Sequence, residues 1–336
     1  MRTEYKYIDI LKFIFAIFVV CLHVPLKGTY IENWISPIFF RLAVPYFFVA
    51  SGFFIGIKII TNKDGVKWKS IFKRYAEKLL VFEPISIAIQ VAIMIFTATA
   101  ISTIITSVCK SIVFYPWGAL WYIQALIVGL ALLIPFIKRD KLWLALIISI
   151  ILYGFALLCN RYYFLTTGTW LEPIVQNYLK IFVSARNGVF VGMMYMAMGM
   201  LIARYADRLN RYKSYLSGLM VISFIVFIFE VSLLQNKIGA DDNALFITHI
   251  LLIPLLFIVS TQHHCKKLGN TLILRNLSTS IYLIHSPINY TIKAACEIFK
   301  ITINPYIHLL IIIGIVLLIS YPIYRNKTQP LYRWLT

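Results

Sequence analysis

The sequence predicts an all-α fold, namely a polytopic transmembrane helical bundle of about ten helices with both termini in the cytoplasm. Of the 336 residues, 60% are hydrophobic and only 13% are charged, and the mean hydropathy is +0.82. Soluble domains carry about 25% charged residues. Long apolar segments recur along the whole chain, and the basic residues gather in alternate loops between them. These observations exclude a soluble globular domain.

The apolar segments define the predicted membrane spans. A transmembrane helix needs about 20 mostly apolar residues, and the candidate segments are 7–27, 37–57, 79–100, 118–137, 142–160, 181–203, 214–235, 245–261, 272–292 and 307–324. The hydrophilic stretches between them are too short for a separate folded domain. Residues 1–336 are therefore expected to form a single membrane domain, and any chemistry must take place among its helices.

The net charge of +19 is explained by membrane topology. Most Lys and Arg residues lie before the first span, after the last span, or in the even-numbered loops 58–78, 138–141, 204–213 and 262–271. This asymmetry places both termini in the cytoplasm. Anionic lipid headgroups are the expected partner of the basic face, and no nucleic acid is expected.

Signatures of several other protein classes are missing from the chain. The five cysteines form no Cys-x-x-Cys pair, so the sequence predicts neither a metal site nor a disulfide framework. It has no glycine-rich phosphate-binding loop either, which argues against an ATP-driven pump and against a dinucleotide enzyme. A basic stretch that starts at Trp68 is typical of an amphipathic interfacial helix.

Two ionisable residues share one face of the first span. Lys12 and His23 are eleven positions apart, which places them nearly in register and about 16 Å apart along a helix. Lys12 would lie toward the cytoplasm, where it could meet a phosphate, and His23 toward the outer side, where it could accept a proton. In the structural alternative Lys12 reaches the headgroups or pairs with Asp9, and His23 makes polar contacts near the boundary.

The second span begins with Arg41 at the predicted depth of His23. Within it, Pro45 predicts a kink and Gly52 predicts close approach of another helix, while Ser51 is expected to serve packing. The following loop carries a cationic strip that could attract a polyphosphate-containing donor, although ordinary positive-inside charge would look similar. Its members are Lys67, Lys69, Lys73, Arg74 and Lys78.

Further polar residues lie within or beside the later spans. They are Glu83, Arg186, Asn187, Glu230, His249 and His285. Each is a functional candidate or a structurally satisfied group. Pro287, two residues after His285, predicts a break in the ninth span. Near the outer face Trp121 and Tyr122, with Tyr115 and Trp117, could stack on a sugar or form an interfacial belt.

Four pieces of sequence occur in a familiar order: Asp9-Ile-Leu-Lys12 to His23, Arg41 to Phe54, Gly118 to Tyr122, and Ser280 to Pro287. From about Tyr5 to Tyr324 the chain resembles the acyltransferase 3 family of integral membrane proteins. The resemblance implies ten core helices. It also implies transfer of an acyl group, usually acetyl, from cytoplasmic acyl-CoA to an extracytoplasmic glycan, peptidoglycan or lipid-linked sugar.

The resemblance assigns roles to individual residues. In the family the first helix carries a motif of an Arg, ten residues and an essential His. His23 matches this motif. Lys12 stands at the place of the Arg and lacks the planar guanidinium that can make two parallel hydrogen bonds. The resemblance therefore implies that His23 is catalytic. Our leading hypothesis makes His23 the general base and Arg41, or another nearby donor, the oxyanion stabiliser, and a transient acyl-histidine is the other possible route. Acyl-CoA, without a metal, would be held by Lys12, Lys73, Arg74 and Lys78. Substrate would be bound by Trp121, Tyr122, Arg186, Asn187 and His285.

The resemblance also implies partners and a location. The acceptor would be a carbohydrate or another hydroxyl compound of the cell envelope, and the protein would lie in the inner or plasma membrane with multiple spans. The extracytoplasmic esterase-like domain of some members is not expected here. Transfer would then be completed within the bundle, within a homo-oligomer, or with an envelope partner protein.

One stretch supports an alternative within the same family. Residues 184–190 and the later Asp241-Asp242-Asn243 run look like the membrane domain of vancomycin-resistance serine racemases, which is associated with serine uptake. The alternative is a transporter-like protein that handles a small amino acid such as serine, with Arg186 binding its carboxylate. A scaffold or flippase partner in envelope assembly is a third hypothesis.

Overall fold

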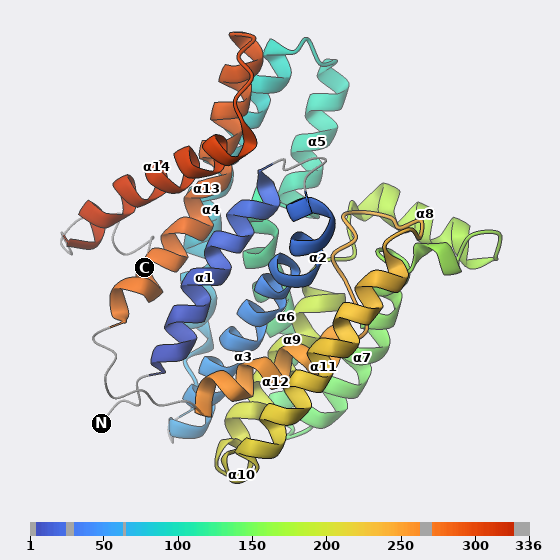
Figure 1. The fold of residues 1–336 in the computed structure, drawn as a ribbon, viewed down its shortest axis with the longest axis vertical. Helices are drawn as coiled ribbons and strands as arrows, with labels where there is room; N and C mark the ends of the chain where they lie inside the picture. Colours follow the sequence, from blue (N-terminus) through green and yellow to red (C-terminus); the bar gives the residue numbers. More distant parts are fainter. Residues whose placement is uncertain (1–4, 25–29, 63–64, 263–270, 326–336) are drawn as a thin grey trace. The chain divides into compact units, whose positions relative to one another are not determined.

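The computed structural model describes residues 5–24, 30–62, 65–262 and 271–325 (Figure 1). Within these ranges the regular secondary structure is helical and no strand occurs. The principal α-helices are α1 (Lys6–His23), α2 (Ser36–Phe39), α3 (Ala43–Thr61), α4 (Trp68–Phe96), α5 (Ile101–Val113), α6 (Trp121–Lys138), α7 (Leu142–Leu158), α8 (Leu171–Phe182), α9 (Met193–Arg204), α10 (Ala206–Arg211), α11 (Lys213–Leu234), α12 (His249–Gln262), α13 (Leu272–Ile298) and α14 (Pro305–Arg325).

Several of these helices have the length and composition of membrane spans. Five helical stretches of the described chain are long and apolar enough to cross a bilayer: Ile31–Thr61, Trp68–Phe96, Ile101–Lys138, Lys213–Leu234 and Pro305–Pro322. Shorter apolar helices cover Leu142–Leu158, Gly188–Arg204 and His249–Gln262. Each segment predicted as a span contains a helix. The prediction of an all-α, multi-pass membrane bundle is therefore confirmed.

The structure adds helices that the hydropathy pattern did not predict. Helices α5 and α8 lie in segments expected to be loops. Conversely, the basic stretch after Trp68 is no separate interfacial helix, because it continues without interruption as the first turns of α4. Short amphipathic helices are hard to predict because their polar side lowers the mean hydropathy below that of a span.

Two prolines act differently from the prediction. Pro45 lies in the first turn of α3, directly after a short 3₁₀ turn at Phe40–Leu42, so it helps to start this helix rather than kink its middle. Pro287 lies inside α13, which continues to Ile298 without the expected break. A membrane helix tolerates a proline when neighbouring groups satisfy the carbonyl that it leaves without a partner.

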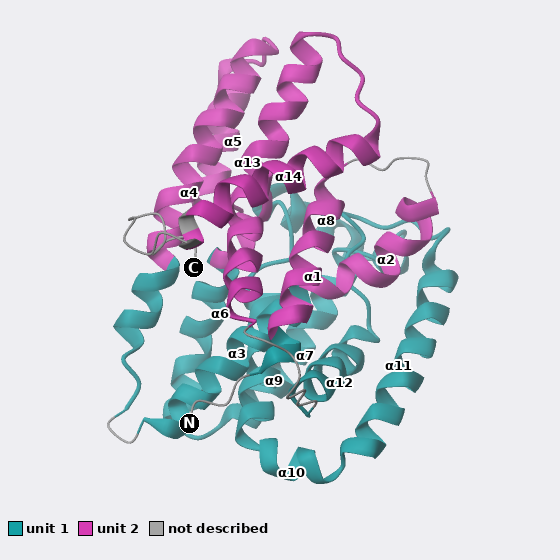
Figure 2. Ribbon diagram, turned by 60° about the vertical axis from the view of Figure 1, so that its left-hand side comes forward, with its two compact units in different colours: residues 1–8, 44–75, 124–265 teal, residues 9–43, 76–123, 266–336 magenta. Residues whose placement is uncertain are grey.

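The chain divides into two compact units (Figure 2). Unit 1 comprises residues 1–8, 44–75 and 124–265, and unit 2 comprises residues 9–43, 76–123 and 266–336. In unit 1 the buried helix α9 packs closely on α3. A Cβ added at Gly52 would lie 2.2 Å from the Met196 carbonyl oxygen, and one added at Gly199 would lie 2.1 Å from the Val49 carbonyl oxygen. The predicted close approach at Gly52 is thereby confirmed.

Unit 2 is organised around α13. This helix packs against α14 and against the short 3₁₀ turn η3 (Gly118–Leu120) that precedes α6. The end of α1 reaches the same part of α13, because Asn289 and Lys293 both bind the carbonyl oxygen of His23. Three segments that are distant in sequence thus meet at the middle of α13.

Candidate active site

Two histidines from different helices lie together in unit 2. His23 is the last residue of α1, and His285 lies in α13. Their ring centroids are 5.2 Å apart. His285 is fully buried and His23 is half-buried. The structure therefore brings together a predicted catalytic residue and a predicted substrate-binding residue.

The polar side of α13 extends beyond His285. Tyr282 precedes it, Ser286, Asn289 and Lys293 follow it, and all lie on one face of the helix. All but Lys293 are buried. A buried polar face on a membrane helix needs partners within the protein. Those partners come from α1 and η3.

The hydrogen bonds of His285 define its tautomer. Its Nδ1 lies 2.8 Å from the Ile281 carbonyl oxygen, which can only accept, so Nδ1 carries the hydrogen. Nε2 lies 3.2 Å from Ser286 Oγ. In the neutral imidazole Nε2 has the lone pair, and the Ser286 hydroxyl donates to it. The neutral form of His285 is thus the Nδ1–H tautomer, with Nε2 as its basic atom.

A glycine turn positions Ser286 opposite η3. Gly118 has a φ of +65°, and a Cβ added there would lie 2.7 Å from Ser286 Cβ. The Ala119 N–H donates to Ser286 Oγ at 3.3 Å. The Tyr282 hydroxyl donates to the Ala119 carbonyl oxygen. Only glycine combines this backbone conformation with so close an approach.

The carbonyl oxygen of His23 has two donors from α13. Asn289 Nδ2 donates to it at 2.9 Å and Lys293 Nζ donates at 3.2 Å. The last carbonyls of a helix lack partners within it, and a cation near this end is favourable for the helix dipole. These bonds fix the end of α1 beside His285.

Glu83 of α4 contacts the segment just before η3. Its Oε1 accepts the Trp117 N–H at 3.3 Å. Glu83 is 7% exposed. Glu83 therefore supports the turn that carries Gly118.

The other residues predicted for the outer side lie in the same unit. Tyr122 packs edge-on against Tyr282, with ring centroids 5.4 Å apart, and Trp121 stacks on Tyr115 at 5.8 Å. Arg41 follows Phe40, whose ring lies 4.9 Å from that of Phe18 in α1. These contacts place Tyr122 beside the polar face of α13 and the segment of Arg41 beside α1.

The predicted donor-binding residues are distributed over both units. Lys12 and Lys78 belong to unit 2, and Lys73 and Arg74 belong to unit 1. Lys78 is 7% exposed, whereas Lys73 and Arg74 are exposed on α4. A donor site on these residues stays a prediction.

The beginning of α1 is joined to the beginning of α13. Asp9 accepts a hydrogen bond from Thr271 Oγ1 at 2.9 Å and lies 4.0 Å from Arg275 Nε. Asp9 is buried, and the Arg275 side chain is about half exposed. Both ends of α1 are thus held by polar contacts to α13.

Arg186 of unit 1 is bound by two carboxylates. Its Nε lies 3.2 Å from Asp241 Oδ2 and its Nη1 lies 2.8 Å from Asp242 Oδ2. Ser184 Oγ donates to the same Asp241 oxygen at 2.5 Å. The guanidinium charge is therefore already balanced by the protein. A substrate carboxylate at Arg186 would have to displace these partners.

Asn187 begins the helical segment η5 (Gly188–Gly192) that leads into α9. Its Oδ1 accepts the N–H groups of Val189 at 3.0 Å and Phe190 at 3.2 Å. Its Nδ2 donates to the Tyr178 hydroxyl at 2.9 Å, and burial raises the pKa of Tyr178 to about 12. Asn187 thus acts as the N-cap of this segment. The predicted span therefore begins only after Asn187.

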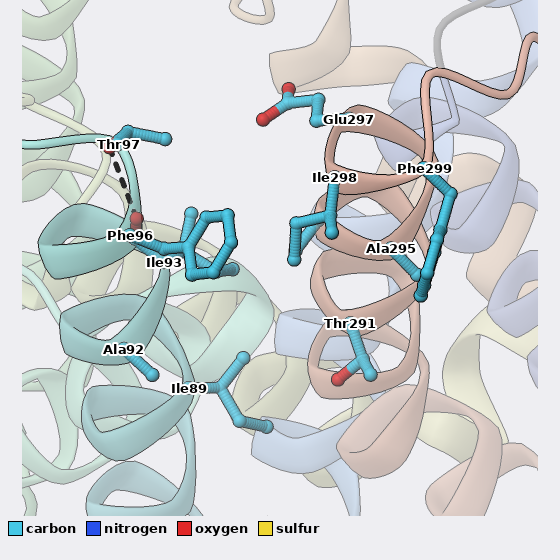
Figure 3. A pocket seen from close by; sticks show the side chains of 11 residues that line it. Ile89, Ala92, Ile93, Phe96, Thr97, Thr291, Ala295, Glu297, Ile298 and Phe299 are labelled. Atoms are coloured by element: carbon cyan, nitrogen blue, oxygen red, sulfur yellow. Dashed lines mark hydrogen bonds between the residues drawn. The ribbon is translucent and has the colours of Figure 1, made fainter.

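A separate cavity lies between α4 and α13 in unit 2 (Figure 3). Its volume is about 530 Å³, and its wall is mostly apolar, with Ile298 of α13 pointing toward Phe96 of α4. Ala294 and Ile298 lie on the side of α13 opposite to His285 and Asn289. The cavity is therefore distinct from the site of the histidine pair.

Several residues of this site were not predicted from the sequence. Asn289 and Lys293 lie outside the recognised motifs, and Ser286 and Gly118 occur only as parts of them. The signal was present in the helical spacing from Tyr282 through His285 and Asn289 to Lys293, which marks a polar face on an otherwise apolar span. Their contacts with His23 and η3 carried no such signal.

Comparisons with known proteins agree with the arrangement of motifs. The sequence model of a family described as an acyltransferase domain, Acyl_transf_3, matches residues 5–325. A serine/alanine racemase of Enterococcus gallinarum is 26% identical over 298 residues, which are 83% of this chain and 40% of that protein. An amino-acid racemase of Enterococcus faecalis is 23% identical over 325 residues, 93% of this chain and 45% of that protein.

These relatives are considerably longer than the chain. It spans less than half the length of each of these two curated relatives. No solved structure gives a significant match. The family match, in contrast, covers almost every residue, including both histidines and the glycine turn. The chain belongs to the acyltransferase 3 family.

Proposed function

We propose that this protein is an integral membrane O-acyltransferase of the inner or plasma membrane. It moves an acyl group, acetyl in the simplest case, from cytoplasmic acyl-CoA to a hydroxyl of an extracytoplasmic envelope acceptor such as a glycan. Family membership supports a membrane acyltransferase. The observation that carries the proposal is the pairing of His23 with His285 beside a buried polar helix face.

The proposed reaction needs a base at the acceptor hydroxyl. His23 accepts the hydroxyl proton as the acceptor oxygen attacks the thioester carbonyl. The new ester bond forms, the carbon–sulfur bond breaks, and the proton passes to the leaving thiolate. General base catalysis of this kind contributes about 10²- to 10⁴-fold. His285 has its ring centroid 5.2 Å from that of His23 and helps to position this base.

Arg41 and the lysines have supporting roles in this proposal. Arg41 stabilises the oxyanion of the tetrahedral intermediate, which is worth about 10²- to 10³-fold where single donors have been removed. Lys12, Lys73, Arg74 and Lys78 attract the phosphates of the donor. Lysine at position 12 offers a point charge rather than a planar fork.

The first experiment measures acetyl transfer and donor binding by the full chain in lipid nanodiscs. Radiolabelled acetyl-CoA is supplied to wild type, His23→Ala and His285→Gln. Both variants should bind acetyl-CoA as wild type does, and His23→Ala should lose turnover by about 10²-fold or more. His249→Gln, a change at a buried histidine of unit 1, is the matched control. Normal turnover by His23→Ala would exclude this mechanism.

The racemase relatives support a second candidate function. Because racemases of Enterococcus share this region, a transporter-like role with a small amino acid such as serine is the alternative. Arg186 is paired with Asp241 and Asp242, which argues against Arg186 as a free binding site for the carboxylate of an amino acid. Proteoliposomes that accumulate radiolabelled L-serine without consuming acetyl-CoA would favour transport. Absence of uptake together with acetyl transfer would exclude it.

A further inference from the structure

One acceptor atom beside the histidine pair has no partner within the described chain. Asn289 is 2% exposed, and its Oδ1 makes no hydrogen bond among the described residues. Buried amide oxygens are nearly always hydrogen-bonded, and each exception calls for an explanation such as a ligand or a water. The orientation of the amide is fixed, because Nδ2 must face the accepting carbonyl oxygen of His23.

The structural role of Asn289 is duplicated by a neighbour. Its Nδ2 donates to the His23 carbonyl oxygen, but Lys293 Nζ donates to the same oxygen at 3.2 Å. An apolar side chain at position 289 would therefore still leave a donor at the end of α1. Holding the end of α1 therefore does not explain why position 289 has an amide, whose Oδ1 is left unsatisfied.

The unsatisfied oxygen lies next to the proposed reaction centre. Asn289 follows His285 by one helical turn, so their Cβ atoms are about 5–6 Å apart on the same face of α13. An acceptor hydroxyl held at the histidines would place its neighbouring substituents near position 289. An amide oxygen accepts hydrogen bonds only, so the group that it binds must be an N–H or O–H donor.

We propose that Asn289 Oδ1 binds a second hydroxyl of the acceptor, adjacent to the hydroxyl that is acylated. The acceptor is therefore a vicinal diol or polyol, as a sugar ring is, and Asn289 determines specificity for it. This inference rests on the proposed acyltransferase function and deepens it. The Asn289 amide oxygen takes the place of a water molecule as hydrogen-bond partner of that hydroxyl. An alcohol without the second hydroxyl leaves Oδ1 unsatisfied and should be a poorer substrate.

The test uses two ring alcohols that differ by one hydroxyl. Acetyl transfer from acetyl-CoA to trans-1,2-cyclohexanediol and to cyclohexanol is measured with the full chain in nanodiscs. Wild type should prefer the diol in kcat/KM by about 10-fold, the upper range for one neutral hydrogen bond. Asn289→Leu should lower this ratio to about 1, because the acceptor oxygen is lost. A wild-type ratio near 1, or an unchanged ratio in Asn289→Leu, would overturn the inference.

Lys293→Met is the matched control. It removes the other donor to the His23 carbonyl oxygen but no acceptor, so the diol preference should persist whatever the absolute rate. Loss of the preference in Lys293→Met as well would assign the effect to the end of α1 rather than to Asn289 Oδ1. That result would also contradict the inference.

Thermal unfolding distinguishes failure of this inference from failure of the proposed function. The diol should raise the unfolding midpoint of wild type more than cyclohexanol does, and this difference should vanish in Asn289→Leu. If the diol stabilises only wild type but no acetyl group is transferred, the polyol site stands and the proposed function fails. If transfer depends on His23 but neither readout distinguishes the alcohols, a water occupies Oδ1 and the inference fails.

Discussion

The imidazole rings of His23 and His285 lie with their centroids 5.2 Å apart, where the end of α1 meets the middle of α13. His23 is the last residue of α1, and its carbonyl oxygen accepts hydrogen bonds from Asn289 and Lys293. His285 has its tautomer set by the Ile281 carbonyl oxygen. Both positions are thus fixed by backbone contacts, which favours a site that is organised before substrate arrives.

If the two histidines act as one unit, their substitutions will not be additive. His23→Ala and His285→Gln should each reduce acetyl transfer. The double variant should have nearly the same kcat/KM as the less active of the two single variants. The measurement is a double-mutant cycle on kcat/KM with acetyl-CoA. Losses that multiply would mean that the rings act independently.

Gly118 should tolerate no side chain. Gly118→Ala adds a Cβ 2.7 Å from Ser286 Cβ at a φ of +65°. Gly168→Ala is the matched control, because Gly168 has a φ of +74° but nothing within 4 Å of the added atom. The control carries only the left-handed backbone cost, about 1–2 kcal/mol. Gly118→Ala should lower the unfolding midpoint further and reduce activity, and equal effects would argue against the close packing.

The packing of α3 on α9 should depend on Gly52. Gly52→Ala would bring a Cβ to 2.2 Å from the Met196 carbonyl oxygen, a backbone atom that cannot move aside alone. Overpacking costs about 1–3 kcal/mol or more. Gly218→Ala in α11 meets nothing within 4 Å and should be neutral or slightly stabilising. Folded yield and unfolding midpoint in nanodiscs compare the two variants, and equal values would contradict this interface.

The ion pairs of Arg186 should matter for stability. Arg186→Leu leaves Asp241 and Asp242 partly buried without their cation, at a cost of about 1–3 kcal/mol. Its acetyl transfer per folded molecule should remain close to wild type. A selective loss of transfer with unchanged stability would instead assign Arg186 to substrate binding.

The exposed pair of Arg204 with Asp140 is the control for Arg186. The hydrogen bond from Arg204 holds the pKa of Asp140 below its usual value. Any contribution of this pair is therefore present at neutral pH and is lost as the pH falls through the lowered pKa. Because Asp140 is fully exposed, Arg204→Leu should not change the unfolding midpoint measurably at pH 7.

The predicted orientation is tested by cysteine labelling in a cysteine-free background. Lys67→Cys lies in an exposed segment assigned to the cytoplasm, and Asn236→Cys lies in an exposed turn assigned to the opposite side. A membrane-impermeant maleimide added to intact cells should label only Asn236→Cys. Labelling of Lys67→Cys alone would reverse the topology.

Composition alone determined that this chain is a helical membrane protein, because an apolar segment in a bilayer must satisfy its backbone hydrogen bonds within itself. The order of motifs around His23, Arg41 and His285 also identified the family. Helices α5 and α8 were not predicted, because their amphipathic composition gives a mean hydropathy like that of loops. α13 continues through Pro287, although a proline removes one hydrogen bond of the helix and locally predicts a break.

Only the tertiary structure decided which polar residues meet. His23 and His285 are brought together by the packing of α1 on α13. Asn289 is placed beside them by its hydrogen bond to the His23 carbonyl oxygen. Spacing along one helix predicts which residues share a face. It does not predict which face of another helix they contact, because that depends on the packing of the whole unit. Arg186, a predicted ligand for a carboxylate, proved to have two carboxylates of its own for the same reason.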